Sequence, residues 1–221
     1  MKVGLLFGTF DPIHKGHLAV VENAISTYLL DQIWFVVTPQ SPFKKNSILA
    51  SEKHRFKMVE LATQSHSKFF ASKIEFQLEY PNYTFNTLSF LNSQFGSSYE
   101  FSIIVGLDNY TSLMKDEWYK SEHLLKNYRF FIYQRNTSIY LNDKISFVQF
   151  AQKYRHIILN GLDIEISSSQ IRELFLCKKN LLQSLKHDIS NQSKNIQQLR
   201  YFLPQIVLQY IENNSLYSDS K

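Results

Sequence analysis

The fold is decided by residues 4–17, which read GLLFGTFDPIHKGH. An apolar strand, residues 3–7, runs into a turn at Gly8, and His17 opens a helix whose apolar residues recur with helical spacing. Gly8 and Gly16 carry no side chain and let the backbone approach a ligand closely. Because a helix start offers free N–H groups and the positive end of a dipole, this strand-to-helix junction predicts an anion site.

Two histidines lie three residues apart in this stretch. His14 and His17 can present both imidazoles to one side of the anion, which indicates a triphosphate site with histidine donors. The pattern of a Walker A loop is missing. A zinc site is disfavoured, because Cys177 is the single cysteine and the other histidines lie in unrelated contexts. An ordinary structural turn is the remaining alternative.

Composition narrows the class of partner. The chain has 221 residues, a net charge of +5 and a pI near 9.1, which suits polyanionic substrates such as nucleotides. Without a run of lysine and arginine, nucleic acid is not expected as a partner. One cysteine favours a reducing compartment, and neither a signal peptide nor a membrane-length apolar run is visible. We expect a cytoplasmic protein without a membrane partner, and its oligomeric state stays open.

Strands alternate with helices along the chain, which predicts an α/β fold with a Rossmann-like, doubly wound parallel sheet. A core of residues 1–160 and a small helical C-terminal subdomain of residues 161–221 are expected. Strands are predicted at residues 3–7, 32–38, 72–79, 101–105, 129–134 and 155–159. Ligands bind at the carboxyl ends of such strands. The residues that follow four of these strands should therefore ring one crevice: Gly8, Pro39, Gly106 and Arg135.

The motif GTFDPIHKGH, residues 8–17, resembles the signature of the HxGH nucleotidyltransferase superfamily. Its members join a nucleoside triphosphate to a phosphate-bearing acceptor and release pyrophosphate. The signature alone leaves nicotinate-nucleotide, nicotinamide-nucleotide, pantetheine-phosphate and glycerol- or choline-phosphate transferases open. The resemblance implies catalytic roles for His14 and His17. It also implies an ATP site made by Gly8, Thr9, Phe10, His14, Gly16 and His17.

A second motif, residues 166–172, reads ISSSQIR. Serine hydroxyls and N–H groups at a helix start can hold phosphate oxygens, and Arg172 can pair with them bidentately. Taken alone, the motif is more simply explained as a plain N-cap beside a solvated arginine. It resembles the superfamily's ISS[ST]xIR motif, which binds the triphosphate. This implies that Ser168, Ser169 and Arg172 bind ATP and that Arg172 is catalytic.

The segment of residues 39–46 must be a loop, because two prolines exclude a helix or a central strand. Its lysines are either solvated or neutralise phosphates over the crevice. The segment partly resembles the N-P-P-H-K loop of nicotinate-nucleotide adenylyltransferases, with Phe43 where that family often has histidine. The resemblance implies that Lys44 contacts phosphate, as a catalytic and substrate-binding residue.

Two further stretches bear on the acceptor. Residues 83–88, YTFNTL, resemble the S-Y-T-x-[DE]-T-L element of the nicotinate-nucleotide branch, with Asn86 replacing the acid. The resemblance implies that Tyr83 and Thr84 contact the pyridine carboxylate, which a helix N-terminus suits. Thr84 as a plain N-cap is the alternative.

The stretch after residue 105 carries the pattern G-x-D followed by a tryptophan ten residues later. In the family, the glycine and the aspartate line the nucleotide site, and the tryptophan stacks on the pyridine. The resemblance therefore implies that Gly106 and Asp108 bind ATP and that Trp118 binds the acceptor. Trp118 as a core aromatic and Asp108 as a helix cap are the alternatives.

Together, these resemblances imply adenylyl transfer from ATP to nicotinate mononucleotide, giving deamido-NAD and pyrophosphate in NAD biosynthesis. Mg²⁺ is expected to arrive bound with ATP. Nicotinamide mononucleotide and phosphopantetheine are alternative acceptors, and a catalytically silent nucleotide-binding module is the alternative from another class. Residues 203–217 resemble the C-terminal ending of the nicotinate-nucleotide branch, whereas residues 177–198 are longer than the family's usual link and have no assigned role.

Overall fold

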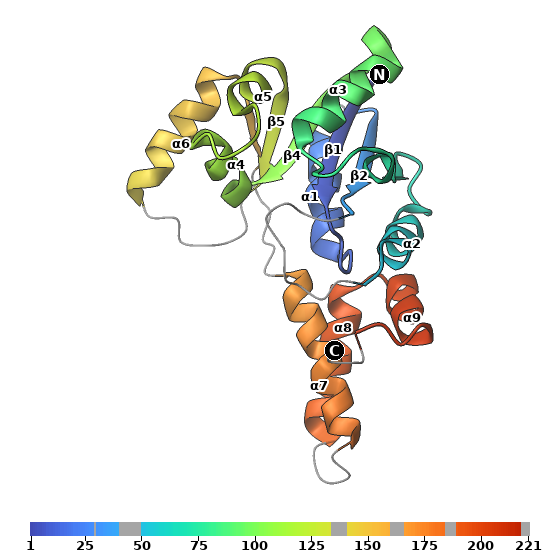
Figure 1. Cartoon of the computed structure of the whole chain (residues 1–221). Coiled ribbons are helices and arrows are strands. Elements are labelled where there is room, and N and C mark those ends of the chain that lie inside the picture. Colours follow the sequence, from blue (N-terminus) through green and yellow to red (C-terminus); the bar gives the residue numbers. More distant parts are fainter. Residues whose placement is uncertain (29, 40–49, 134–140, 160–165, 184–188, 218–221) are drawn as a thin grey trace.

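The computed structural model describes residues 1–28, 30–39, 50–133, 141–159, 166–183 and 189–217. Its centre is a six-stranded sheet in which every neighbouring pair is parallel and the strand order is β3-β2-β1-β4-β5-β6 (Figure 1). The order reverses between β1 and β4, where doubly wound sheets bind ligands. The predicted Rossmann-like α/β fold is confirmed. The strands are β1 (Lys2–Gly8), β2 (Gln32–Val37), β3 (Phe69–Ser72), β4 (Glu100–Gly106), β5 (Arg129–Tyr133) and β6 (Ile157–Leu159).

Helices cover both faces of the sheet because alternate strand residues point to opposite sides. On one face, Leu6 belongs to a buried cluster with residues of α1 (Lys15–Tyr28) and α2 (Glu52–Thr63). On the other face, Leu5 belongs to a second cluster with residues of four further helices. These are α3 (Thr84–Phe95), α4 (Leu107–Met114), α5 (Ser121–Asn127) and α6 (Leu141–Lys153).

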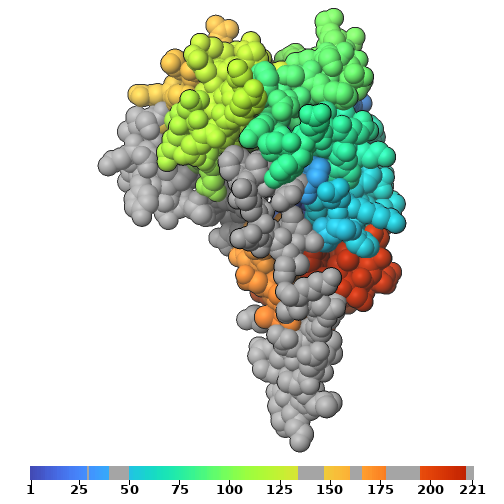
Figure 2. All heavy atoms as spheres, in the orientation of Figure 1, coloured from blue at the N-terminus to red at the C-terminus, as the bar shows by residue number. Residues whose placement is uncertain are grey.

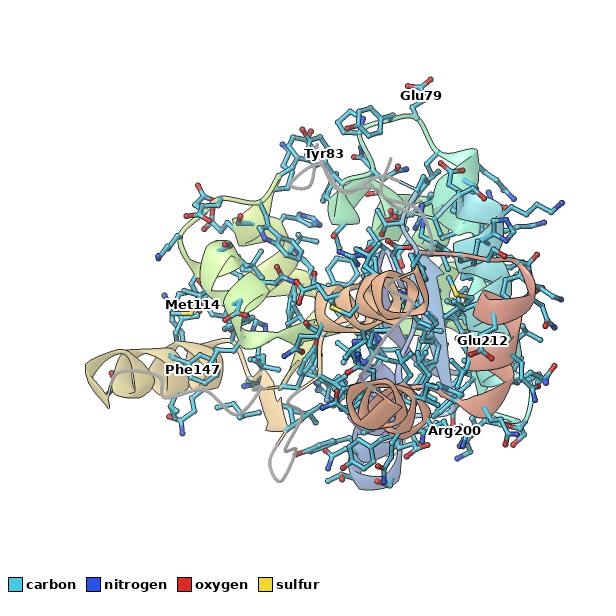
Figure 3. The ribbon with its side chains drawn as sticks, turned by 90° about the horizontal axis from the view of Figure 1, so that it is seen from below. Glu79, Tyr83, Met114, Phe147, Arg200 and Glu212 are labelled. Carbon is cyan, nitrogen blue, oxygen red and sulfur yellow. The ribbon has the colours of Figure 1, made fainter. Side chains whose placement is uncertain are left out.

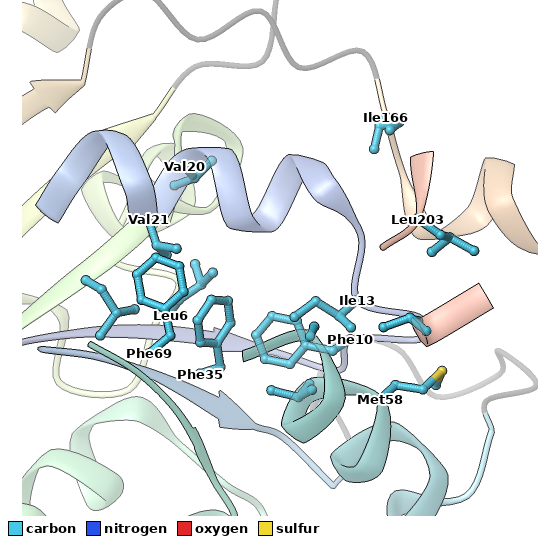
Figure 4. Packing of buried hydrophobic residues seen from close by; sticks show 14 of the residues in the cluster. Leu6, Phe10, Ile13, Val20, Val21, Phe35, Met58, Phe69, Ile166 and Leu203 are labelled. Carbon is cyan, nitrogen blue, oxygen red and sulfur yellow. The ribbon is translucent and has the colours of Figure 1, made fainter. Parts of the chain in front are cut away.

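Three C-terminal helices lie below the carboxyl ends of the strands in Figure 1: α7 (Ser168–Gln183), α8 (Ile189–Phe202) and α9 (Gln205–Asn213). Ile13, Ile166 and Leu203 belong to one buried cluster, so these helices share a core with the sheet (Figure 4). In the space-filling view, α9 in red lies directly below α2 in cyan (Figure 2). His54 and Tyr210 join these two helices by a 2.9 Å hydrogen bond. The division at residue 160 stays a prediction.

Two strand predictions are wrong in their bounds. Residues 72–79 alternate like a strand, yet β3 ends at Ser72 and residues 74–77 form the 3₁₀ helix η1 (Ile74–Gln77). The sheet offers no further pairing there, because β3 runs against β2 only as far as the pair Val36 and Ser72. The last strand begins at Ile157, after Arg155 turns the chain with a positive φ of 58°.

The polar segment of residues 177–198 contains the end of α7 and most of α8. Among the helices that the structure describes, none is both long enough and apolar enough to cross a membrane.

Candidate active site

The turn after β1 is built around Gly8 and Phe10. A Cβ atom on Gly8 would lie 3.1 Å from the Phe10 ring, so a side chain at this position forces the ring to move. Phe10 has a positive φ of 47° and is 2% exposed. Its ring meets the His17 ring edge-on, with the centroids 5.2 Å apart. The turn thus supports one of the two predicted catalytic histidines.

His14 and His17 lie face to face. Their ring centroids are 3.7 Å apart, and the two planes differ by 30°. The His14 carbonyl accepts the backbone N–H of His17 at 2.9 Å, and the His14 backbone N–H donates to His17 Nδ1 at 3.2 Å. Because Nδ1 of His17 accepts, the proton of its neutral ring is on Nε2. The structure therefore brings the two imidazoles together, with Nε2 of His17 as a donor.

The serine-rich motif packs directly on this turn. Ser168 Oγ donates to the Pro12 carbonyl at 2.9 Å, and Arg172 Nη1 donates to the Asp11 carbonyl at 2.7 Å. Arg172 Nη2 donates to Ser169 Oγ at 3.2 Å, and 22% of the Arg172 side chain stays exposed. The two motifs that are far apart in the sequence form one surface beyond the end of β1.

The carboxylate of Asp11 lies beneath that surface and is 1% exposed. Its Oδ1 accepts the backbone N–H of Ala50 at 3.0 Å and the hydroxyl of Tyr217 at 2.7 Å. Arg172 Nη1 lies 3.7 Å from Oδ2. Burial raises the pKa of Asp11, although both hydrogen bonds and the two nearby arginines lower it. Burial and the Asp11 charge also raise the pKa of Tyr217.

Arg55 is a second buried charge close to the turn, at 1% exposure. Its Nη1 donates to the carbonyls of Thr9 at 2.7 Å and Thr38 at 2.8 Å. Its Nη2 donates to the Pro39 carbonyl, and its Nε donates to the Ala50 carbonyl at 3.0 Å. Burial lowers the pKa of Arg55. One guanidinium therefore binds the turn after β1 and both ends of the segment of residues 40–49.

Lys44 and Phe43 lie outside the described residues, as does Arg135. The role predicted for Lys44 stays a prediction, but Pro39 and Ala50 at the two ends of its segment are fixed by Arg55.

The acceptor residues predicted at α3 stand at its start. Tyr83 is the N-cap residue and Thr84 the first helical residue, so the alternative of Thr84 as the cap is wrong. The Tyr83 ring lies 5.1 Å from the ring of Tyr119, between centroids. Trp118 is half-buried against the cluster on the α3 face. Figure 3, a view from below, places Tyr83 and Arg200 at opposite margins of the molecule.

Gly106 and Gly8 end the adjacent parallel strands β4 and β1, as predicted. Asp108 is exposed in the first turn of α4, and the N-cap of that helix is Gly106, so Asp108 is not its cap. The hydrogen bonds of Trp118 stay within its own segment: its backbone N–H donates to Ser121 Oγ at 3.1 Å, and its carbonyl accepts that hydroxyl at 2.7 Å. Within the described part of the chain, no group of three or more His, Cys, Asp or Glu side chains could hold a metal ion.

Sequence reasoning missed the supporting charges. The signature motif gives Asp11 no role of its own, and the C-terminal resemblance gives none to Tyr217. Arg55 does leave a signal, because it shares the buried side of α2 with Met58 and Val59, where a charge is unusual. The contacts that Asp11, Arg55 and Tyr217 form join segments far apart in the chain, so they leave no local pattern in the sequence.

Comparisons with known proteins identify the family. The family model for cytidylyltransferase-like proteins matches residues 5–174. A Flavobacterium psychrophilum protein named "Probable nicotinate-nucleotide adenylyltransferase" is 41% identical, covering 98% of this chain and 99% of the relative. The "Nicotinate-nucleotide adenylyltransferase" of Bacillus subtilis is 32% identical, covering 98% of both chains.

A solved structure supports the fold. The nicotinic acid mononucleotide adenylyltransferase of Plasmodium falciparum complexed with NaAD superposes with a TM-score of 0.72 at 18% identity, covering 99% of this chain and 98% of the other. The two sequence relatives match over nearly their full lengths and exceed 30% identity. The chain therefore belongs to the nicotinate-nucleotide adenylyltransferase family.

Proposed function

We propose that this protein transfers the adenylyl group of ATP to nicotinate mononucleotide, forming deamido-NAD and pyrophosphate in NAD biosynthesis. One observation carries the proposal most strongly. Arg172 donates to the Asp11 carbonyl at 2.7 Å, next to the stacked pair of His14 and His17. Cationic and N–H donors from two distant motifs thus converge at the strand ends, where a triphosphate would bind.

In the proposed reaction, a 5′-phosphate oxygen of the acceptor attacks the α-phosphorus of ATP in line. The bond from that phosphorus to the bridging oxygen breaks, and pyrophosphate leaves with the electron pair. Phosphate is already a competent nucleophile, so catalysis is positioning and charge stabilisation. His14 and His17 donate to the α-phosphate, whereas Lys44 and Arg172 hold the β- and γ-phosphates.

The remaining predicted residues would hold the two substrates. The backbone of Gly8, Thr9 and Phe10 wraps the nucleotide, with support from Gly16, Gly106, Asp108, Ser168 and Ser169. Tyr83 and Thr84 receive the pyridine carboxylate at the start of α3, and Trp118 stacks on the pyridine. ATP enters as its Mg²⁺ complex, with the cation on triphosphate oxygens as part of the substrate. The single cysteine favours the cytoplasm as the compartment.

Pyrophosphate release tests the proposal. The protein is incubated with Mg-ATP and, in parallel, with nicotinate mononucleotide, nicotinamide mononucleotide or phosphopantetheine, and the products are separated by chromatography. We expect deamido-NAD and a strong preference for the nicotinate substrate. Preference for another acceptor would overturn the acceptor assignment, and silence with all three would leave a nucleotide-binding module. When His17 is replaced by alanine in the same assay, His66→Ala is the matched control for the loss of a histidine. His66 precedes β3 and therefore lies at the amino ends of the strands, opposite the site.

A further inference from the structure

A buried carboxyl group lies beneath the start of α3 and has no role in the mechanism above. Glu75, in η1, is 2% exposed. Its Oε1 accepts the hydroxyl of Thr87 at 2.8 Å, and its backbone carbonyl accepts Asn82 Nδ2 at 2.9 Å. Thr87 is in the first turn of α3, and Asn82 directly precedes the N-cap residue Tyr83. Glu75 therefore accepts hydrogen bonds from one residue before and one residue after the start of α3, the helix start that would receive the pyridine carboxylate.

Among the residues that the structure describes, few charges act on this carboxyl group. The two elements that adjoin it, β2 and α3, contain no charged residue, and the segment around η1 contributes Lys73 and Glu79, both exposed. On α2, which meets η1 through the rings of Phe56 and Phe76, the buried charge is Arg55, and its guanidinium is bound by backbone carbonyls. Burial raises the pKa of Glu75 to about 7, although the hydroxyls of Thr87 and Thr38 lower it.

We propose that Glu75 determines how strongly the acceptor site holds a carboxylate. When Glu75 is protonated, the positive end of the α3 dipole is left to the carboxylate of the substrate. When it is ionised, its negative charge, held against Thr87 in the first turn of α3, opposes the positive end of that dipole and weakens binding. The inference rests on the proposed function and makes Glu75 a positioning residue, since it acts through the helix start and not on the reacting atoms.

The test compares kcat/KM for nicotinate mononucleotide in the wild type and in Glu75→Gln, about one pH unit below and above the pKa of about 7. The amide of glutamine stays neutral and keeps an acceptor for Thr87. We expect the ratio of variant to wild type to be near one at the lower pH and to rise roughly tenfold at the higher pH. The change should appear in the KM of the acceptor, with kcat and the KM of ATP unaltered.

Taking the ratio cancels the titration of the substrate phosphates and of the histidines, which both proteins share. Glu79→Gln removes the same charge from an exposed position four residues away and should leave the ratio near one throughout. A second variant, Thr87→Val, removes the hydroxyl that favours the ionised form, so the rise in KM should move to higher pH.

A flat ratio for Glu75→Gln, a change carried by kcat, or an unmoved midpoint in Thr87→Val would overturn the proposal. Absence of wild-type turnover with nicotinate mononucleotide at the lower pH would instead overturn the proposed function, so the two failures are distinguishable.

Discussion

Replacing Glu75 by glutamine should change how stability depends on pH. The pKa of Glu75 rises from 4.5 to about 7 on folding because the carboxyl is buried. Below the lower value the group is protonated in both states. Between the two values the group is ionised in the unfolded chain but mostly protonated in the folded protein. The free energy of unfolding therefore falls as pH rises from the unfolded to the folded pKa, and it levels off above the folded pKa. At about 1.4 kcal/mol per unit, the loss is about 3 kcal/mol in total.

Glu75→Gln has no such titration. The free energy of unfolding of the variant minus that of the wild type should therefore increase by about 3 kcal/mol from about pH 4.5 to above pH 7. Urea denaturation followed by circular dichroism at several pH values measures this difference, and the other titrating groups cancel. Glu79→Gln should give a difference that does not vary with pH. A constant difference for Glu75→Gln would refute the reasoning, because it would mean that the buried carboxyl keeps its ordinary pKa.

Three further predictions concern the turn after β1. His17→Ala should lose about 3 kcal/mol of transition-state stabilisation in kcat/KM, the scale of one lost oxyanion donor, and near-normal turnover would contradict its role. Arg55→Met should lower the free energy of unfolding by about 3 to 5 kcal/mol, because the carbonyls of Thr9 and Ala50 lose their donor. The stability of Arg55→Lys should lie between that of the wild type and that of Arg55→Met. Tyr217→Phe should cost about 2 kcal/mol in the same assay, because Asp11 loses a hydrogen bond; an unchanged midpoint would argue against it.

The parts of this fold that depend on local pattern were predictable. The strand, turn and helix of residues 2–28 follow from glycine spacing and apolar periodicity, and the structure has them as β1 and α1. The pairing of His14 with His17 follows from their spacing on one turn. The error at residues 72–79 has the opposite origin. Residues 74–77 alternate as a strand does, but strand formation needs a partner, and β2 has ended by then.

The interior of the site depends on tertiary contacts and could not be predicted in this way. Arg55 binds carbonyls from three separate segments, and Tyr217 reaches Asp11 across almost the entire chain. A buried carboxyl such as Glu75 has its pKa set by surroundings that a single sequence does not reveal. The resemblance to the family supplied the motifs on the surface of the site, and the structure supplied the charges that support them.

The hydrogen bond between Asp11 and Tyr217 also orders events during synthesis. The hydroxyl of Tyr217 is synthesised 206 residues after its partner Asp11. At about 5 to 20 residues per second, this delay is roughly 10 to 40 s. Throughout that interval the nascent chain carries the signature turn without the hydroxyl that completes its buried carboxylate. The signature turn should therefore reach its full stability only after Tyr217 has emerged from the ribosome.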